Sequence, residues 1–475
     1  MSQIYLTNTL SREKELFAPI HPGSVGIYHC GPTVYWNQHI GNMRSMVIAD
    51  LLYRMFTYNR YTVDLVRNYT DVGHLTGDNI GDADTGEDRM TKAVQREHLT
   101  PNEIANKYIN QFAQDIAQLN IKTPTHTPRA TEHITDMIDM VQKLLDEGYA
   151  YTTPYAVYFD ISQFPEYTKL SGQKLDQLSS GEGHGDASDT NKKNPHDFSL
   201  WFFKAGEHAN ALQTWKSPFV SELVEDGEGF PGWHIECSAM SKHFLGPTFD
   251  IHMGGIEHIP IHHTNEIAQS ECSNHAPMAH FWMHIEHLLV DNKKMAKSEG
   301  TSYLVSDIIE KGYDPMVLRY FFLQSNYRSK QNFTWEGLEA SHVAYQKLKN
   351  YIAGISEIGE VSESYQTLFR DMVSDDLNTA GGLALVWELI KNPEISDADK
   401  KATILDFDNV LGLKLDEVIA DTDLEIPEHL QKLLKEREIA REKKDWHTSD
   451  LIRNEISALG YELKDTDDGQ KVRKI

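Results

Sequence analysis

The sequence is short of cysteine and of positive charge, and both shortages limit what the protein can do. Only three cysteines occur in 475 residues. They cannot form a disulfide framework, so the thiols are reduced or bind a metal. The net charge is −26, with 45 Lys and Arg against 71 Asp and Glu. Since nucleic-acid affinity depends on basic residues that neutralise phosphates, an indiscriminate polyanion binder is excluded, and any contact with a nucleic acid must be local.

Long apolar runs and a targeting segment are also absent. The chain has no apolar run of about 18 residues, the length that a membrane-spanning helix needs. The first residues do not form a charged region followed by an apolar stretch, as a signal peptide would. We therefore expect a cytoplasmic protein without membrane contact. Its 40% of hydrophobic residues can support about two to four domains.

The N-terminal region predicts a parallel α/β sheet. Residues 25–30 and 61–69 have the composition of buried strands, and residues 44–57 between them have the apolar spacing of a helix. Such a strand–helix–strand unit is typical of a Rossmann-like, doubly wound parallel sheet, in which ligands bind at the carboxyl ends of the strands. Residues 39–42 then lie at the entrance of the helix.

Downstream of this unit the pattern changes twice. Helical periodicity at 102–119 and 131–147 and a strand-like segment at 151–161 precede residues 179–195, which are rich in Gly, Ser, Asp and Asn and predict a loop. We interpret residues 121–229 as an insertion that splits the sheet. The C-terminal region is predicted to be mainly α-helical, with amphipathic segments at 338–352, 364–375, 380–390 and 397–411 and a further helix from Pro427.

Two short segments predict a split nucleotide site. They contain His39-Ile40-Gly41-Asn42 and Lys294-Met295-Ala296-Lys297-Ser298. His39 and Asn42 can donate hydrogen bonds beside the backbone N–H groups of a helix N-terminus, and Gly41 permits close approach of a nucleotide. Lys294 and Lys297 can bind phosphates as mobile point charges. The sequence contains no G-x-x-x-x-G-K-[ST] phosphate loop, which favours the split site.

A second set of residues predicts a metal site beside the first. Cys30 and Cys237 supply two thiols, while His262 and Glu266 are four residues apart and share one face of a helix. Two thiolates, an imidazole and a carboxylate suit tetrahedral zinc. The alternative is two buried thiols, a surface histidine and a solvated glutamate. Cys272 is expected to be an ordinary thiol. Further histidines could compete as ligands but are expected to be structural or surface residues, namely His252, His258, His263, His284 and His287.

The two nucleotide-site segments resemble the His-Ile-Gly-His and Lys-Met-Ser-Lys-Ser sequences of class I aminoacyl-tRNA synthetases. Nearly end to end, the chain is similar to the bacterial cysteinyl-tRNA synthetase family. The matching segments are 28–35, 231–240 and 262–270, with further ones at 8–10, 67–71, 375–379 and in the tail from 443–446 through 459–463. The chain departs from the family at Asn42, at Ala296 and in residues 253–260. Asn42 can still donate through its amide but cannot titrate, so we expect an altered contact and not an inactive site.

The resemblance implies a cysteine–tRNA ligase that forms cysteinyl-adenylate from L-cysteine and ATP and transfers the acyl group to the 3′ end of tRNA(Cys). It implies Mg²⁺ with ATP and one Zn²⁺ per chain that selects cysteine through a zinc–thiolate bond. We expect a monomer or a weakly associating protein. The implied catalytic residues are His39, Asn42, Lys294 and Lys297, and those that contact ATP are His39, Gly41, Asn42 and Lys297. The implied amino-acid site consists of Cys30, Thr70 and Trp233, and the zinc ligands are Cys30, Cys237, His262 and Glu266.

By the same resemblance the chain divides into six parts. They are the first half of the Rossmann catalytic domain (1–120), the insertion (121–229), the second half of the catalytic domain (230–290), a loop and stem-contact region (291–340), a helical bundle (341–420) and a small anticodon-binding domain (421–475).

The C-terminal tail is the least acidic part of the chain. Residues 430–475 hold 11 Lys and Arg against 10 Asp and Glu. Seven of these basic residues either meet tRNA phosphates or lie on a solvated helix face, namely Lys432, Lys435, Arg437, Arg441, Lys443, Lys444 and Lys464. Trp446 either stacks on an exposed base or anchors a helix.

Two other functions stay open at this point. One is a paralogous ligase that passes activated cysteine to a small amine, which the retained C-terminal region disfavours. The other is a non-catalytic tRNA-binding or zinc-dependent regulatory protein in which Asn42 marks a relic of the adenylation site.

Overall fold

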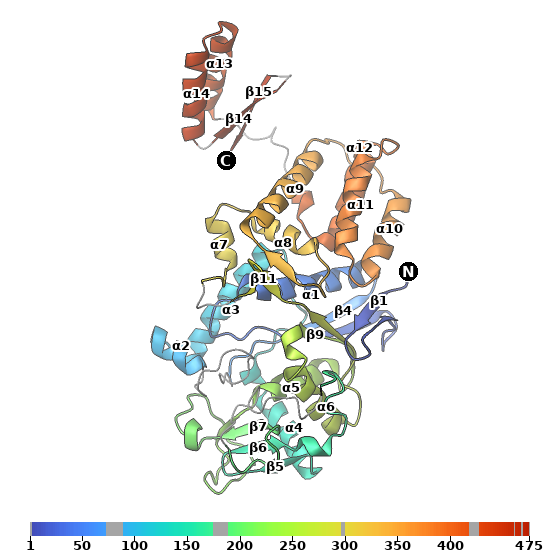
Figure 1. The fold of residues 1–475 in the computed structure, drawn as a ribbon, viewed down its shortest axis with the longest axis vertical. Coiled ribbons are helices and arrows are strands. Elements are labelled where there is room, and N and C mark those ends of the chain that lie inside the picture. The colour runs from blue at the N-terminus through green and yellow to red at the C-terminus, as the bar shows by residue number, and fades with distance from the viewer. Residues whose placement is uncertain are drawn as a thin grey trace. The chain divides into compact units, whose positions relative to one another are not determined.

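The computed structural model describes residues 2–72, 89–173, 189–295, 300–417, 427–459, 461–466 and 469–474. The chain forms two compact units (Figure 1). The larger unit comprises Met1–Gln346 and Glu357–Leu415, and the smaller comprises Lys347–Ser356 and Asp416–Ile475. The predictions made for Ala296 and Lys297 fall outside the described residues.

A four-stranded parallel sheet lies at the centre of the larger unit. Its strand order is β10-β9-β3-β4, and all neighbours are parallel. Helix α1 (Ile40–Tyr58) connects β3 to β4, so the predicted strand–helix–strand unit and Rossmann-like sheet are confirmed. The four strands are β3 (Ser24–His29), β4 (Thr62–Arg67), β9 (Phe249–Gly255) and β10 (Ala279–Ile285).

Helices cover both faces of this sheet. Helix α1 lies on one face, while α5 (Trp233–Leu245) and α6 (His262–Asn274) lie on the other (Figure 1). The strands are therefore buried from both sides, and most of their residues are buried, including the polar Asp250 and His252 of β9. Because parallel strands end at the same edge, the residues that follow β3, β4 and β9 come together there.

The segment between α4 (Ile134–Asp146) and α5 forms an antiparallel sheet of order β5-β6-β7-β8. The prediction of one strand over residues 151–161 is wrong, because a turn containing Pro154 divides it into the hairpin β5/β6, closed by a 2.8 Å bond from Thr153 N to Ala156 O. The predicted helices at 102–119 and 131–147 are confirmed as α3 (Pro101–Gln118) and α4. The four strands are β5 (Ala150–Thr152), β6 (Ala156–Phe159), β7 (Phe198–Phe203) and β8 (Gly229–Pro231).

One hydrophobic core runs from the antiparallel sheet through α4 and α5 to the parallel sheet. It contains aromatic residues of the insertion, such as Trp201, together with Tyr28 of β3. Cys30 and Cys237 belong to the same core. The two thiols thus lie in one apolar environment although 207 residues separate them along the chain.

The rest of the larger unit is mainly helical, as predicted. The helices are α2 (Arg89–Glu97), α7 (Val305–Glu310), α8 (Pro315–Leu323), α9 (Trp335–Ala353), α10 (Glu363–Ser374), α11 (Thr379–Lys391) and α12 (Asp397–Leu411). The last residues of α9 belong to the smaller unit. The remaining strands are β1 (Tyr5–Asn8), β2 (Glu13–Leu16), β11 (Leu288–Val290), β12 (Lys293–Lys294) and β13 (Gln331–Phe333). No helix in the described ranges is long and apolar enough to cross a membrane.

A buried ion network joins α1 to this helical part. The Asp50 carboxylate accepts from Arg54 Nε at 2.7 Å and from Arg319 at 2.6 Å. Arg319 also donates to Leu411 O at the end of α12. Burial would raise the pKa of Asp50, but the two guanidinium groups hold it below its usual value. Removing one partner of such a buried pair lowers the free energy of unfolding by about 3–5 kcal/mol. The network therefore holds α1 against α8 and α12.

The described residues of the smaller unit include the end of α9 and form α13 (Glu428–Glu442), α14 (Trp446–Ala458) and the hairpin of β14 (Tyr461–Thr466) and β15 (Gly469–Lys474). Helix α13 starts directly after Pro427, as predicted. Arg437 is only 2% exposed and donates to Gln470 Oε1 at 2.8 Å, so its predicted contact with a phosphate is wrong. Trp446 is 59% exposed, which disfavours its interpretation as a packing anchor.

Candidate metal and nucleotide site

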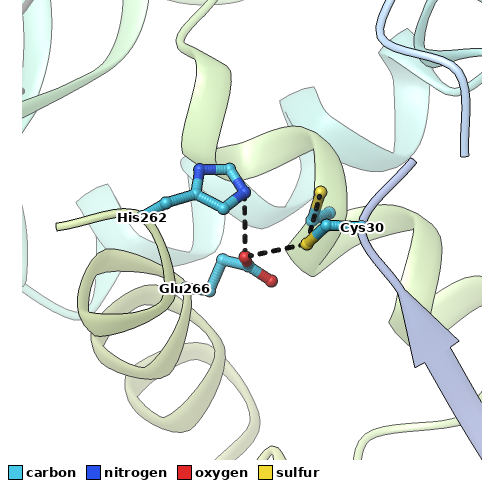
Figure 2. Close-up of side chains that lie close together, drawn as sticks. Cys30, His262 and Glu266 are labelled. Atoms are coloured by element: carbon cyan, nitrogen blue, oxygen red, sulfur yellow. Dashed lines mark hydrogen bonds and ion pairs between the residues drawn. The ribbon is translucent and has the colours of Figure 1, made fainter. Parts of the chain in front are cut away.

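Four side chains from three parts of the larger unit converge at the carboxyl edge of the parallel sheet. Cys30 follows β3, Cys237 lies on α5, and His262 and Glu266 lie one turn apart on α6. The two Sγ atoms are 3.9 Å apart, and Glu266 Oε1 lies 3.8 Å from Cys30 Sγ and 3.0 Å from His262 Nε2. Figure 2 shows Cys30, His262 and Glu266 pointing toward one another. All four ligand atoms lie within 4.8 Å of one another, and all four residues are buried.

This arrangement fits zinc. A tetrahedral zinc ion about 2.3 Å from each sulfur spaces the two sulfurs about 3.8 Å apart. The Sγ–Sγ distance of 3.9 Å agrees with that spacing, although no disulfide joins these free cysteines. Buried anionic ligands also need a compensating cation, because an unpaired buried charge is costly. The surface-histidine and solvated-glutamate alternative is wrong, since His262 is 2% and Glu266 0% exposed.

The pKa values in the cluster follow from burial and from the neighbouring charges. Burial would raise the pKa of Glu266, but His252 and His262 hold it well below its usual value. Burial would lower the pKa of His262, but the Glu266 carboxylate raises it to about 10. Burial and Cys237 raise the pKa of Cys30, whose thiol donates to Cys237 and lowers the pKa of that residue to about 6.

A second group of ligand atoms overlaps the first and comprises Cys30, His252, His263 and Glu266. His252 Nε2 lies 2.7 Å from Glu266 Oε2, and its Nδ1 lies 3.1 Å from the carbonyl oxygen of Tyr28. Both ring nitrogens thus face protein oxygens, which compete with a metal for His252. The geometry favours the first group, with His252 holding the outer oxygen of Glu266.

His262 is oriented in a similar way. Its Nδ1 lies 2.8 Å from Nδ1 of His234. Its Nε2 faces Glu266 Oε1 at 3.0 Å as a donor. A metal would displace the Nε2 proton, and Nδ1–H donating to His234 would then leave the Nε2 lone pair for the ion, as in most metal-binding histidines. Among the other histidines, His263 contacts His284 at 2.7 Å, and both are buried and hydrogen-bonded, in line with a structural role.

Asn68 links the cluster to the predicted amino-acid site and was not singled out from the sequence. Its Oδ1 accepts from Gly31 N at 2.9 Å, and its Nδ2 donates to Thr70 Oγ1 at 3.1 Å. Cys237 Sγ lies 3.9 Å from the same Oδ1. The Trp233 ring packs against the His262 ring with centroids 4.2 Å apart. Thr70 and Trp233 thus both lie beside the cluster, and the only signal for Asn68 was its place in the segment 67–71.

The two nucleotide-site segments meet in space. A methyl group added at Gly41 would lie 2.3 Å from Cε of Met295, so Met295 packs directly over the start of α1. Ile40 N also donates to the carbonyl oxygen of Tyr303 at 2.8 Å. Lys294 is the exposed last residue of β12 and lies next to Met295 in the chain. Lys297 lies outside the described residues.

His39 is the N-cap of α1. Its Nδ1 accepts a 3.2 Å hydrogen bond from Asn42 N. In the neutral ring the proton is then on Nε2, which becomes a donor. A donor beside the first turn of a helix is the arrangement that phosphate groups bind.

One glycine-rich sequence has a different role. Residues 227–232 fit the pattern G-x-G-x-x-G, but they include the short strand β8 of the antiparallel sheet. A methyl group at Gly229 would lie 2.0 Å from Phe202 O, and one at Gly232 would lie 2.2 Å from Ser199 O. These glycines permit close strand packing, so the pattern is not a nucleotide loop.

Comparison with known proteins identifies the family. A model described as the class I (C) tRNA synthetase catalytic domain matches residues 16–343, and one described as the cysteinyl-tRNA ligase anticodon binding domain matches residues 423–473. Cysteine–tRNA ligase 1 of Burkholderia lata is 41% identical, with 98% of this chain and 96% of that protein aligned. The chain belongs to the cysteine–tRNA ligase family. It is an aminoacyl-tRNA synthetase, as the sequence resemblance implied.

Other relatives agree. The cysteine–tRNA ligases of Treponema denticola and Thermus thermophilus are 39% and 38% identical, and the alignments cover 97% and 99% of this chain and the same shares of those proteins. The Mycobacterium tuberculosis methionyl-tRNA synthetase in complex with methionyl-adenylate has a similar fold, with a TM-score of 0.54 and 13% identity over 84% of this chain and 91% of that one.

Within this cysteine–tRNA ligase family member, Gln38 holds the unusual Asn42 in place. The side-chain amide of Asn42 donates to Gln38 Oε1. Gln38 Nε2 donates to the carbonyl oxygens of Thr33 and Trp36 at 2.9 and 3.2 Å. Gln38 is 7% exposed. The Asn42 amide is thus fixed to the loop that leads from Cys30 to α1.

Replacing either thiol should empty the metal site. We expect Cys30→Ser or Cys237→Ser to lower zinc affinity at least about 10- to 100-fold, because losing even an outer partner of a metal ligand has that effect. The loss of affinity is measured as the zinc content per chain after dialysis against a chelator. Cys272→Ser is the matched control, since Cys272 is also buried but belongs to neither group of ligand atoms. Equal zinc loss in all three variants would argue against the site.

Gln38 and Asn42 should act as a unit in adenylate formation. We expect Gln38→Ala and Asn42→Ala each to lower kcat/KM for ATP in pyrophosphate exchange, and the double variant to lose less than the product of the two losses. Contacting residues typically show coupling of about 0.5–3 kcal/mol. Gln142→Ala, which removes a helix-surface hydrogen bond to Asp146, is the control. Independent, multiplicative losses would show that the Asn42–Gln38 bond does not matter for the reaction.

Proposed function

We propose that this ligase joins L-cysteine to tRNA(Cys) at the expense of ATP and that a zinc ion held by Cys30, Cys237, His262 and Glu266 selects the amino acid. The supporting observation is the convergence of these four residues beside the two nucleotide-site segments at one edge of the sheet. When bound there, zinc supplies a coordination position for the substrate thiolate that a serine hydroxyl cannot occupy equally well.

The protein side chains would position the amino acid. Trp233 packs over His262, and Thr70 is held by Asn68, so both side chains are fixed where they border the cluster. We assign Thr70 and Trp233 to the walls of the amino-acid site together with Cys30. A steric pocket alone separates near-isosteres only about 100-fold. A thiol-specific bond would make a separate editing site unnecessary.

In the first step a carboxylate oxygen of cysteine attacks the α-phosphorus of ATP, the bond to the β-phosphate oxygen breaks, and pyrophosphate leaves with the electron pair. Negative charge grows on the transferred phosphoryl group and on pyrophosphate. His39 Nε2, the first turn of α1 at Gly41 and the Asn42 amide are placed to donate to this charge. Lys294 and Lys297 would supply cations to the phosphates together with Mg²⁺.

In the second step the 3′-terminal ribose hydroxyl of the tRNA attacks the carbonyl carbon of cysteinyl-adenylate and gives up its proton, the bond from this carbon to the phosphate oxygen breaks, and AMP leaves with the electron pair. The match to an anticodon binding domain supports the assignment of the smaller unit to the anticodon. The exposed Trp446 is suited to stack on a base there. We further propose a monomer that acts in the cytoplasm and is divided into the six parts predicted from the sequence.

Discrimination between cysteine and serine tests this function. In amino-acid-dependent ATP–pyrophosphate exchange we expect kcat/KM for cysteine to exceed that for serine by at least about 1,000-fold, beyond what a steric pocket achieves. Charging of tRNA(Cys) should show the same preference. Protein stripped of zinc should lose exchange with cysteine and regain it when zinc is restored. Comparable rates with both amino acids would contradict selection by a thiol-binding metal.

A further inference from the structure

A second cluster of metal-binding groups lies where α4 and α5 pack together. His133 caps the N-terminus of α4, Asp136 lies in its first turn, and His243 lies in the last turn of α5. Both Nδ1 atoms point to the same oxygen, since Asp136 Oδ2 is 2.8 Å from His133 and 3.1 Å from His243. The three ligand atoms lie within 4.8 Å of one another. The ligase reaction as described above uses none of these residues.

An aromatic side chain holds the two imidazoles in place. The ring centroids of His133 and His243 are 4.8 Å apart, and Phe244 packs against both rings at 5.4 and 4.7 Å. Phe244 is itself stacked on His126 at 4.6 Å. Phe244 therefore packs against both of the imidazole rings that converge on Asp136.

The donor set indicates the class of ion. Two imidazoles and one carboxylate suit Zn²⁺, Ni²⁺ or Cu²⁺, whereas Ca²⁺ and Mg²⁺ prefer oxygen ligands. Asp136 and His243 keep 38% and 47% of their side chains exposed. A metal here would thus complete its coordination with water, as sites with three protein ligands do.

The surrounding charges predict moderate affinity. Lys242 is influenced by both Asp136 and Asp139 and by Lys143, so two acids and two bases share this surface. Lys242 and Lys143 thus offset part of the negative charge of Asp136 and Asp139, and attraction for the ion must come from the three ligand atoms themselves. We expect weaker binding than at the buried site, where two thiols participate.

We propose that His133, Asp136 and His243 form a second transition-metal site, which takes Zn²⁺ and clamps α4 to α5. Helix α5 also carries Cys237, so an ion at its last turn would brace a helix of the amino-acid site from its opposite end. The competing interpretation is a metal-free triad in which both imidazoles donate to Asp136. This proposal does not depend on the proposed function.

Zinc titration of the full-length protein, prepared without a polyhistidine tag, tests the proposal. Chelator competition should reveal two ions per chain, one bound tightly and one weakly. His243→Ala and Asp136→Asn should each weaken the second ion at least about tenfold and leave the first in place, because a direct ligand is lost. His275→Ala should keep both ions, since His275 is an exposed histidine that faces Glu147 at 3.1 Å and belongs to none of the ligand groups found among the described residues.

Cobalt spectra separate the two sites independently of activity. The first equivalent of Co²⁺ should produce an intense near-ultraviolet sulfur-to-metal charge-transfer band, and the second should add only weak visible bands that disappear in His243→Ala. Three outcomes would each overturn the proposal. The wild-type protein could bind one ion per chain, the second ion could survive both His243→Ala and Asp136→Asn, or the second ion could bind only at millimolar zinc. Loss of the charge-transfer band in Cys30→Ser with the second ion retained would support it.

Discussion

The buried carboxylate of Glu266 is the interaction on which the site depends. It is 0% exposed and ionised. An unpaired charge buried in this way would destabilise the folded state by several kcal/mol. Compensation comes from two directions, with His252 of β9 at one oxygen and His262 of α6 at the other. β9 and α6 must therefore keep their relative positions. Cys30 after β3 and Cys237 on α5 complete the enclosure, so the four proposed ligands lie together around one buried charge.

The same requirement positions the nucleotide site. The loop that begins at Cys30 leads directly into α1, and Gly31 is packed so tightly that a methyl group there would lie 1.6 Å from Asn68 O. Gln38 then ties the far end of the loop to its own backbone and to Asn42. Because this short loop is anchored at both ends, the distance between the amino-acid site and His39 has little freedom. Near-attack geometry of two substrates needs such rigidity.

Features with short sequence spacing could be predicted, and those that depend on tertiary register could not. The four-residue spacing of His262 and Glu266 and the periodicity around α1 predicted the shared helix face and the parallel sheet. The role of His252 depends on β9 lying beside β3, where His252 is opposite Tyr28, and no local pattern records that pairing. Gln38 escaped notice for the same reason, since its partners are backbone carbonyls of a folded loop. The hairpin at Pro154 was missed because apolar composition alone does not distinguish one strand from two.

Zinc K-edge X-ray absorption on the protein loaded with one equivalent of zinc tests the central claim most directly. The account predicts two sulfur ligands about 2.3 Å from zinc in the free enzyme. Addition of L-cysteine should raise the sulfur count to three, while addition of L-serine should leave it at two. A zinc ion bound only by nitrogen and oxygen, or a sulfur count that cysteine does not change, would contradict selection of the amino acid by direct bonding to its thiolate.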